Sequence, residues 1–262
     1  DFNVGMSSDG DMVRLIEEKR RSGVFLTVLG FGEGNLKDSK MEKIADKGNG
    51  HYAYIDNIIE ARKVLINELG ATLFTIARDV KLQVEFNPSR VASYRLIGYE
   101  NRVLENRDFD DDTKDAGELG AGHSVTAIYE ITLTDRTPDH ISRPLRYSEM
   151  RAPERGRFDN ELLTVSFRYK PPTGNESRLL TEVVKDDMHR FADASETFRF
   201  SAAVVEFGLV LRGSPHRGTA TMAHAIDTAR GARGEDRHGY RAEFVSLAET
   251  AELLMNPVVG ER

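Results

Sequence analysis

The stretch that decides the fold is Val24-Phe25-Leu26-Thr27-Val28-Leu29, a continuous and largely apolar run. Such a run is typical of a strand that is buried on both faces of a parallel sheet. A helix is predicted before it, because Ser7-Ser8-Asp9 offers capping oxygens ahead of an apolar pattern that starts at Met12. That helix is predicted to end at Arg20, Arg21 and Ser22-Gly23, where cations meet its negative end. A helix alternating with such a strand predicts an α/β sheet built from βαβ crossovers.

A second helix and strand follow in the segment Met41–Ile55, where the chain passes through Gly48-Asn49-Gly50 into the expected strand His51–Ile55. Asn57 is then expected to cap a helix with apolar residues at helical spacing as far as Leu69. This order of elements resembles the second half of a von Willebrand factor type A domain, and Met41–Ile55 carries most of the resemblance. Asp79–Glu130 resembles the extra C-terminal region of a bacterial subgroup of these proteins. The resemblance implies that residues 1–74 are the C-terminal half of a doubly wound parallel sheet.

The resemblance also implies a place for a metal site. In this family the ligands are an Asp-x-Ser-x-Ser loop, a Thr on a second loop, and an Asp in a Thr-Asp-Gly turn. No Asp-x-Ser-x-Ser occurs between Asp1 and Leu73, and by resemblance the Thr-Asp-Gly turn would sit immediately before Asp1. Mg²⁺ or Ca²⁺ is therefore expected in a full-length protein and not with this chain alone. The missing N-terminal half of the domain is expected as a partner, as a separate fragment or from another chain.

Alternating apolar and polar residues predict strands after this half domain. Val80, Leu82, Val84 and Phe86 alternate with Lys81, Gln83 and Glu85, which predicts a strand with one wet face. Asn87-Pro88-Ser89 is expected to turn into a second strand, Val91–Tyr99, so that the two form a hairpin. Ser124–Thr134 and Leu162–Lys170 are further expected strands, and the polar segment Asp135–Asn160 between them is expected to be exposed and partly mobile. An antiparallel β-sandwich is therefore predicted for residues 76–192.

The period becomes helical again from Ser195. An apolar helix is expected to end at Gly213-Ser214-Pro215, followed by helices over about Thr219–Arg230 and Tyr240–Met255. Residues 193–262 are thus expected to be a helical region packed on the sandwich. The fold class is α/β plus α+β.

One acidic loop has the spacing of a calcium site. Asp108, Asp110 and Asp112 occupy positions 1, 3 and 5 of such a loop, but Thr113 stands where the required Gly belongs and Leu119 where the bidentate Glu belongs. The three aspartates are candidate metal ligands, and a solvated acidic turn is the plain alternative.

Tyr94, Arg95, Tyr99 and Arg102 are candidate binding residues, because Tyr and Arg are favoured at interaction hot spots. Simple alternation along a strand explains the same residues without binding. The glycine-rich stretch Gly30–Gly34 follows a buried strand and offers backbone amides to an anion, but no Gly-Lys-Ser/Thr follows it. We interpret it as a turn.

Composition narrows the class of protein. The 262 residues include 36 Lys and Arg against 43 Asp and Glu, scattered among one another, which argues against a dedicated nucleic-acid binder. There is no cysteine, so disulfides and thiolate chemistry are excluded. No apolar stretch approaches the roughly 18 residues of a membrane span. None of the seven histidines has zinc-helix spacing, and no residue pattern selects a catalytic triad. No catalytic residue is assigned, and the chain is expected not to be an enzyme.

The leading hypothesis is a non-enzymatic interaction or adhesion-type protein that grips a carboxylate of a protein partner through a divalent ion. One alternative is an accessory subunit of an ATPase or chelatase-like enzyme, since such machines use this domain type to dock an ATPase. Another is a calcium-binding module based on the acidic loop. The resemblance alone suggests the cell envelope as location.

Overall fold

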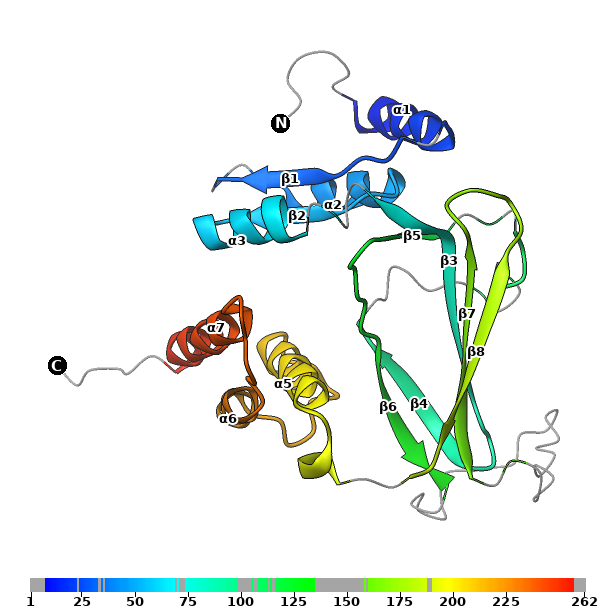
Figure 1. Cartoon of the computed structure of the whole chain (residues 1–262). Coiled ribbons are helices and arrows are strands. Elements are labelled where there is room, and N and C mark those ends of the chain that lie inside the picture. Colours follow the sequence, from blue (N-terminus) through cyan, green and yellow to red (C-terminus); the bar gives the residue numbers. More distant parts are fainter. Residues whose placement is uncertain are drawn as a thin grey trace. The chain divides into compact units, whose positions relative to one another are not determined.

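The computed structural model describes residues 8–22, 24–32, 34, 36–68, 70, 74–98, 105, 108–112, 114, 116–134, 158, 160–187 and 190–256. The chain divides into two compact units, Asp1–Lys185 and Asp186–Arg262, and each is described by itself (Figure 1). The described residues form six α-helices and eight strands, so the chain is a mixed α/β protein. No helix among them combines the length and the apolar character that crossing a bilayer requires.

The first unit begins with the predicted alternation of helix and strand. Helix α1 (Asp9–Arg21) starts where the Ser8 side chain accepts a hydrogen bond from the Asp11 amide. Strands β1 (Val28–Phe31) and β2 (Tyr52–Ile55) pair in parallel, and helix α2 (Asp38–Lys47) connects them. Helix α3 (Ile58–Arg62) follows, capped by Asn57 as expected, and continues into the π-helical turn η1 (Lys63–Asn67).

The predicted strand Val24–Leu29 is wrong in its bounds and its burial. The strand begins at Val28, and Val24 is 58% exposed. Residues before β1 contact the glycine turn after α2 instead of a neighbouring strand, since the Leu26 amide donates to the Gly48 carbonyl at 3.1 Å. Among the described residues, β1 pairs with β2 alone.

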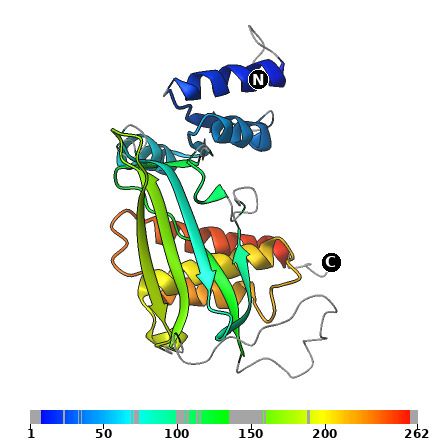
Figure 2. The same cartoon turned by 90° about the vertical axis from the view of Figure 1, so that its right-hand side faces the viewer.

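The rest of the first unit is antiparallel. The central strand β3 (Thr75–Phe86) lies in a four-stranded sheet of order β5-β3-β7-β8, and Figure 2 shows β3 beside β7 and β8. Its other members are β5 (Gly117–Gly120), β7 (Glu161–Lys170) and β8 (Arg178–Lys185). A separate pair consists of β4 (Val91–Ile97) and β6 (Ile128–Leu133). The expected connection Asp135–Asn160 lies outside the described residues, apart from residues 158 and 160.

The predicted hairpin of the strands on either side of Asn87 is wrong, because β3 and β4 belong to different sheets. The Asn87 amide nitrogen Nδ2 donates to the carbonyls of Phe158 and Glu161, at 2.9 and 2.8 Å. This corner therefore ties the end of β3 to the start of β7. The two sheets contact each other near this corner, where the ring of Phe86 at the end of β3 stacks on that of Tyr94 in β4, with ring centroids 4.1 Å apart.

The faces of β3 follow the predicted alternation in only part of the strand. Lys81 is 1% exposed and Leu82 is 53% exposed, the opposite of the predicted alternation. The register with β7 shifts between Arg78 and Lys81, and Asp79 in this interval has φ +52°. A register shift of this kind marks a β-bulge. Further along the strand, Glu85 is exposed and Phe86 is buried, as the alternation predicts.

The second unit is helical, as predicted. It contains the short helix η4 (Phe191–Asp193) and three longer ones, α5 (Glu196–Leu211), α6 (Met222–Gly231) and α7 (Tyr240–Met255). Ser195 caps α5 by accepting from the Phe198 amide at 3.2 Å. Small and branched side chains from all three longer helices form the core: Ala203, Val210, Met222, Ile226, Ala229, Val245 and Ala248.

Candidate functional site

The carboxyl ends of β1 and β2 lie at one edge of the parallel pair, which is where α/β sheets bind ligands. Two tyrosines of β2 hold the segment that follows β1 at this edge. The Tyr54 hydroxyl donates to the Gly32 carbonyl at 3.0 Å, and the Tyr52 hydroxyl donates to the Asp38 carboxylate at the start of α2. Gly32 has φ +84°, a conformation that suits glycine at the point where the chain leaves β1. Gly30 and Phe31, which the sequence interpretation placed in the turn, belong to β1 itself.

Tyr52 is the most strongly perturbed titratable group at this edge. Removal from water raises the pKa of its hydroxyl to about 12, and the hydrogen bond and negative charge of Asp38 act in the same direction. Tyr52 therefore stays protonated at neutral pH and acts as a hydrogen-bond donor.

The same half of the unit exposes large apolar side chains. Phe31 at the end of β1 is 59% exposed, and Ile58 at the start of α3 is 82% exposed. Further along the same helix and η1, Ile59, Leu65 and Ile66 are exposed as well. In a doubly wound fold such side chains are covered by neighbouring strands and helices.

The acidic loop has a cationic partner. Asp112 accepts from Arg168 at 3.0 Å and from the Ser177 hydroxyl at 2.5 Å, and Arg168 also lies 3.4 Å from Asp110. These two hydrogen bonds, that to Ser177 first, lower the pKa of the Asp112 carboxyl. The backbone amide of Asp108 donates to the Glu105 carbonyl. The structure thus joins two of the three candidate metal ligands to a guanidinium.

Two lysines of the neighbouring strands β3 and β7 bind backbone carbonyls of the acidic loop. Lys81 donates to the Asp111 carbonyl at 2.6 Å, and Lys170 donates to the Asp112 carbonyl at 3.0 Å. The counter-charge is Asp79, whose carboxylate lies 2.8 Å from Lys170 and 3.6 Å from Lys81. We call Asp79, Lys81 and Lys170 the buried charge cluster.

Sequence reasoning missed these residues and Arg168. One signal was available, since Arg168 and Lys170 stand two apart on a predicted strand and must share a face. Among the residues that the structure describes, no group of three or more His, Cys, Asp or Glu side chains is arranged to hold a metal ion. The cation site at Asp108, Asp110 and Asp112 stays a prediction.

The aromatic candidates are only partly described. Tyr94 is 60% exposed and stacks on Phe86, and Arg95 pairs with Glu130 on β6, with Nε and Oε2 3.1 Å apart. The second contact is a cross-strand pair of β4 and β6, and the first joins strands of two different sheets of the first unit. Tyr99 and Arg102 lie outside the described residues.

The histidines that the structure describes lie at separate places. His51 and His123 contact each other edge to face, with ring centroids 4.7 Å apart. His224 lies 2.7 Å from Glu206, and His238 stacks on Tyr240. His216 lies in the turn after α5, while His140 and His189 fall outside the described residues.

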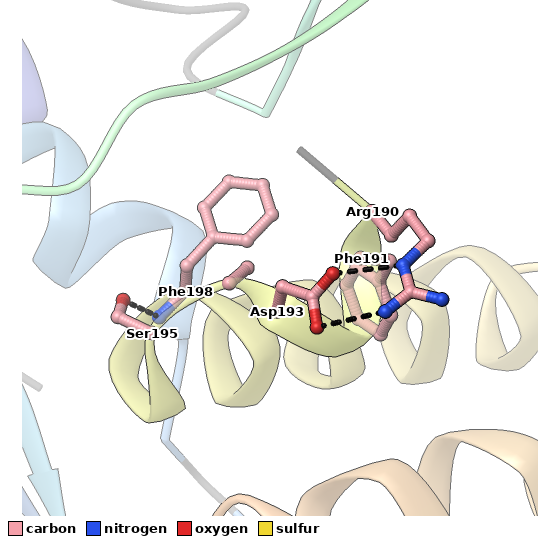
Figure 3. Close-up of a pocket in the computed structure, with 6 residues that line it drawn as sticks. Arg190, Phe191, Asp193, Ser195 and Phe198 are labelled. Carbon is pink, nitrogen blue, oxygen red and sulfur yellow. Dashed lines mark hydrogen bonds and ion pairs between the residues drawn. The ribbon is translucent and has the colours of Figure 1, made fainter. Parts of the chain in front are cut away.

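A surface pocket opens at the start of α5 (Figure 3). Phe191 and Phe198 form its apolar wall, with ring centroids 6.3 Å apart. Arg190 lies at its rim, paired with Asp193 at 2.8 Å, so the guanidinium already has a carboxylate. The pocket therefore offers mainly apolar contact to a ligand, because the charge of Arg190 is already paired with that of Asp193.

The elements described so far define a mixed α/β protein with a parallel pair, antiparallel sheets and a helical unit. The family model "Uncharacterized protein YfbK, C-terminal" matches residues 71–254, more than half of the chain, and the chain belongs to this family. It is 40% identical over 252 residues to "Uncharacterized protein YfbK" of Escherichia coli (strain K12). That match covers 96% of this chain and 43% of the relative, so the chain spans less than half the relative's length.

Among solved structures, the chain is similar to "von Willebrand factor type A from Catenulispora acidiphila", with a TM-score of 0.35 and 17% sequence identity. The likeness covers 88% of this chain and 53% of that one.

Proposed function

We propose that the chain belongs to a non-enzymatic interaction protein, in which residues 8–67 are one part of a larger doubly wound sheet of von Willebrand A type. The exposed apolar side chains at the end of β1 and along α3 and η1 carry this proposal. Parallel sheets occur almost only with both faces covered, and two strands alone do not provide that cover. Phe31, Ile58 and Ile66 are 59, 82 and 69% exposed, so a covering neighbour accounts for their apolar character.

Further strands and helices from a longer polypeptide are the proposed cover. The E. coli relative has room for them, because this chain matches 43% of its length. In the completed sheet, the turn at Gly32 and the start of α3 would border the binding edge. Tyr52 and Tyr54 would keep the first of these segments in place through their bonds to Asp38 and Gly32.

The ligand proposed for that edge is a carboxylate of a protein partner, held through a divalent ion. Hydroxyl and carboxylate oxygens suit Mg²⁺, which keeps a coordination position open for a partner's oxygen. By the resemblance in sequence, these ligands come from loops outside residues 8–67. Tyr52 and Tyr54 then position a neighbouring loop and do not themselves bind the ion.

Titration calorimetry with Mg²⁺ and Mn²⁺ tests the proposal on two proteins, this chain and a longer form that contains the whole A-type domain. We expect the longer form to bind the ion and this chain to give no heat of binding. A longer form that binds neither ion would refute the metal-dependent part of the proposal.

Covering of the sheet is tested separately. Ile66→Ser should destabilise the longer form by about 1.5–3 kcal/mol, the value of burying an isoleucine, and leave this chain nearly unchanged. Leu253→Ser on α7 is a matched control, since Leu253 is 70% exposed and lies in the other unit. Equal effects of Ile66→Ser on the two proteins would show that no cover forms.

A location in the cell envelope is proposed from the sequence resemblance alone. Fractionation of cells that express the longer form provides the test, with recovery in the envelope fraction as the expected result.

A further inference from the structure

Strand β8 ends the four-stranded sheet and is exposed along its whole length. Within the described part of the chain it pairs only with β7, and each of its eight residues is exposed. Its sequence is Arg-Leu-Leu-Thr-Glu-Val-Val-Lys, with no proline or glycine to interrupt a ladder. Four of these side chains are large and apolar: Leu179, Leu180, Val183 and Val184.

The opposite edge of the sheet is built differently. Strand β5 has four residues, begins and ends with glycine, and pairs with β3 through two register shifts. Short and irregular edges of this kind discourage pairing with another chain, whereas a long regular edge leaves a row of free amide and carbonyl groups. The pairing of β8 with β7 is regular from Arg178 to Val184. Among the residues that the structure describes, the β8 edge of this sheet is therefore open to extension.

We infer that β8 pairs antiparallel with β8 of a second copy of this chain, in a two-fold register centred on Leu180. The geometry of the ladder restricts the choice. Successive residues of a strand point their backbone groups to alternate sides, and opposite residues in an antiparallel pair must both point inward or both outward. Two identical strands related by a two-fold axis can therefore pair only in registers centred on a residue.

Charge then selects the centre. Centring on Leu180 sets Arg178 opposite Glu182 of the second copy, twice by symmetry. Centring on Glu182 sets that residue against itself, and centring on Thr181 sets Leu180 against Glu182. Within the described part of the chain, neither Arg178 nor Glu182 forms an ion pair. Opposite charges on directly opposing residues stabilise a sheet, and like charges destabilise it.

Sedimentation equilibrium on the whole chain tests the pairing. We expect a dimer, and a dissociation constant raised about tenfold or more by Arg178→Glu or by Glu182→Arg, because each creates two like-charge contacts. The double variant Arg178→Glu/Glu182→Arg restores opposite charges and should recover the dimer. A monomer at all concentrations up to about 500 µM, or a dimer indifferent to these reversals, would overturn the inference.

Cross-linking gives a second readout that does not depend on affinity. The chain has no cysteine, so Leu180→Cys introduces a single thiol. Opposite residues of a ladder have Cα atoms about 4.5–5.5 Å apart, within the range a disulfide spans. In Glu182→Cys the two thiols would be four residues out of register, roughly 13 Å apart.

We expect rapid oxidation of the Leu180→Cys variant to a covalent dimer and slow oxidation of the Glu182→Cys variant. Equal rates, or faster cross-linking through position 182, would refute the register. Sedimentation and cross-linking both use this chain alone and no metal ion. Their outcomes are therefore independent of the proposed metal-dependent function.

Discussion

The ammonium group of Lys170 lies 2.8 Å from a carboxylate oxygen of Asp79, and that carboxylate is largely withdrawn from water. Lys81, which shares the same counter-ion, has a side chain with no exposed surface. Asp79 also adopts φ +52°, a conformation that costs a non-glycine residue about 1–2 kcal/mol. These ion pairs therefore lie at the bulge of β3, where the backbone adopts its left-handed conformation.

Replacing Asp79 should therefore be among the costliest changes in the first unit. We expect Asp79→Ala to lower the free energy of unfolding by about 3–5 kcal/mol, because two ammonium groups lose their counter-charge in a buried place. Urea denaturation followed by circular dichroism measures this. Glu130→Ala is the matched control, since it removes the exposed partner of Arg95 and should cost about 1 kcal/mol or less. Similar losses for the two variants would contradict a special role of the cluster.

The acidic loop should make the stability of the fold depend on pH through the carboxylate of Asp112. Its pKa in the folded chain lies below the ordinary 3.8, owing first to the hydrogen bond from Ser177 and then to that from Arg168. A depressed folded pKa means that the carboxylate stabilises the fold above pH 3.8 and loses this effect as pH falls through the lower value.

The expected result is that wild type melts higher than Asp112→Asn at pH 7 and that the difference shrinks below about pH 4. Melting temperatures between pH 2.5 and 7 measure it. Ser177→Ala should reduce the difference, because it removes the largest cause of the shift. A gap between wild type and Asp112→Asn that stays constant down to pH 2.5 would show that the carboxylate makes no such contribution.

Calcium should not stabilise the chain through this loop, because Arg168 already lies against Asp110 and Asp112. Melting temperatures with about 5 mM CaCl₂ and with EDTA are expected to agree, since a cation must displace the guanidinium. A calcium-dependent rise that disappears in Asp110→Asn/Asp112→Asn would instead support the calcium-module alternative.

Two glycines of the helical unit should respond oppositely to alanine. Gly208 lies inside α5, and a Cβ there meets no atom within 4 Å, so Gly208→Ala should stabilise the unit by about 1 kcal/mol. Gly213 has φ +60° just after α5, so Gly213→Ala should cost about 1–2 kcal/mol. Calorimetric unfolding of the two variants against wild type tests the pair. A gain at Gly213 would contradict its left-handed conformation.

Gly50 marks the closest backbone approach in the α/β segment. An added Cβ would lie 1.8 Å from the Leu26 carbonyl oxygen, so Gly50→Ala must push two backbone segments apart. We expect a loss of about 3 kcal/mol, at the upper end of overpacking costs. Gly10→Ala in α1 is the control, with open space at its Cβ and a gain of up to about 1 kcal/mol. The rate of hydrogen exchange of the β2 amides measures the change in stability in each of the two variants.

Helices were largely predictable because their signals are local. Ser8, Asn57 and Ser195 each accept a hydrogen bond from an amide two or three residues on, so a short stretch of sequence contains both partners. The α5 and α7 bounds follow from the same kind of information.

Strand partners were not predictable in this way. Val80–Phe86 was recognised as a strand, but its partners are β5 and β7, and the latter lies about 80 residues away in sequence. Strand β8 was missed because its apolar residues come in adjacent pairs and do not alternate. The bulge at Asp79 was not predictable either, because it is defined by the register with the partner strand.

For the candidate site, the spacing of the aspartates identified the acidic loop, but the sequence did not reveal that Arg168 is its partner. Arg168 is 56 residues beyond Asp112, and only the pairing of β3 with β7 brings its neighbour Lys170 to the same place. Tyr52 and Tyr54, whose hydroxyls bond to Asp38 and Gly32, were not singled out from the sequence.

The corner at Asn87 gives the chain a place where sequence can be added. Thr134 bonds to Arg90 and Ser89 on one side of this turn, while Phe158 and Glu161 bond to Asn87 itself. The two ends of the segment between residues 134 and 158 are thus fastened to a single turn. The entropic cost of closing a loop grows only slowly with its length, so this fastening makes the length and content of the segment nearly independent of the sheets. A reporter peptide or a small domain could therefore be grafted between these two ends.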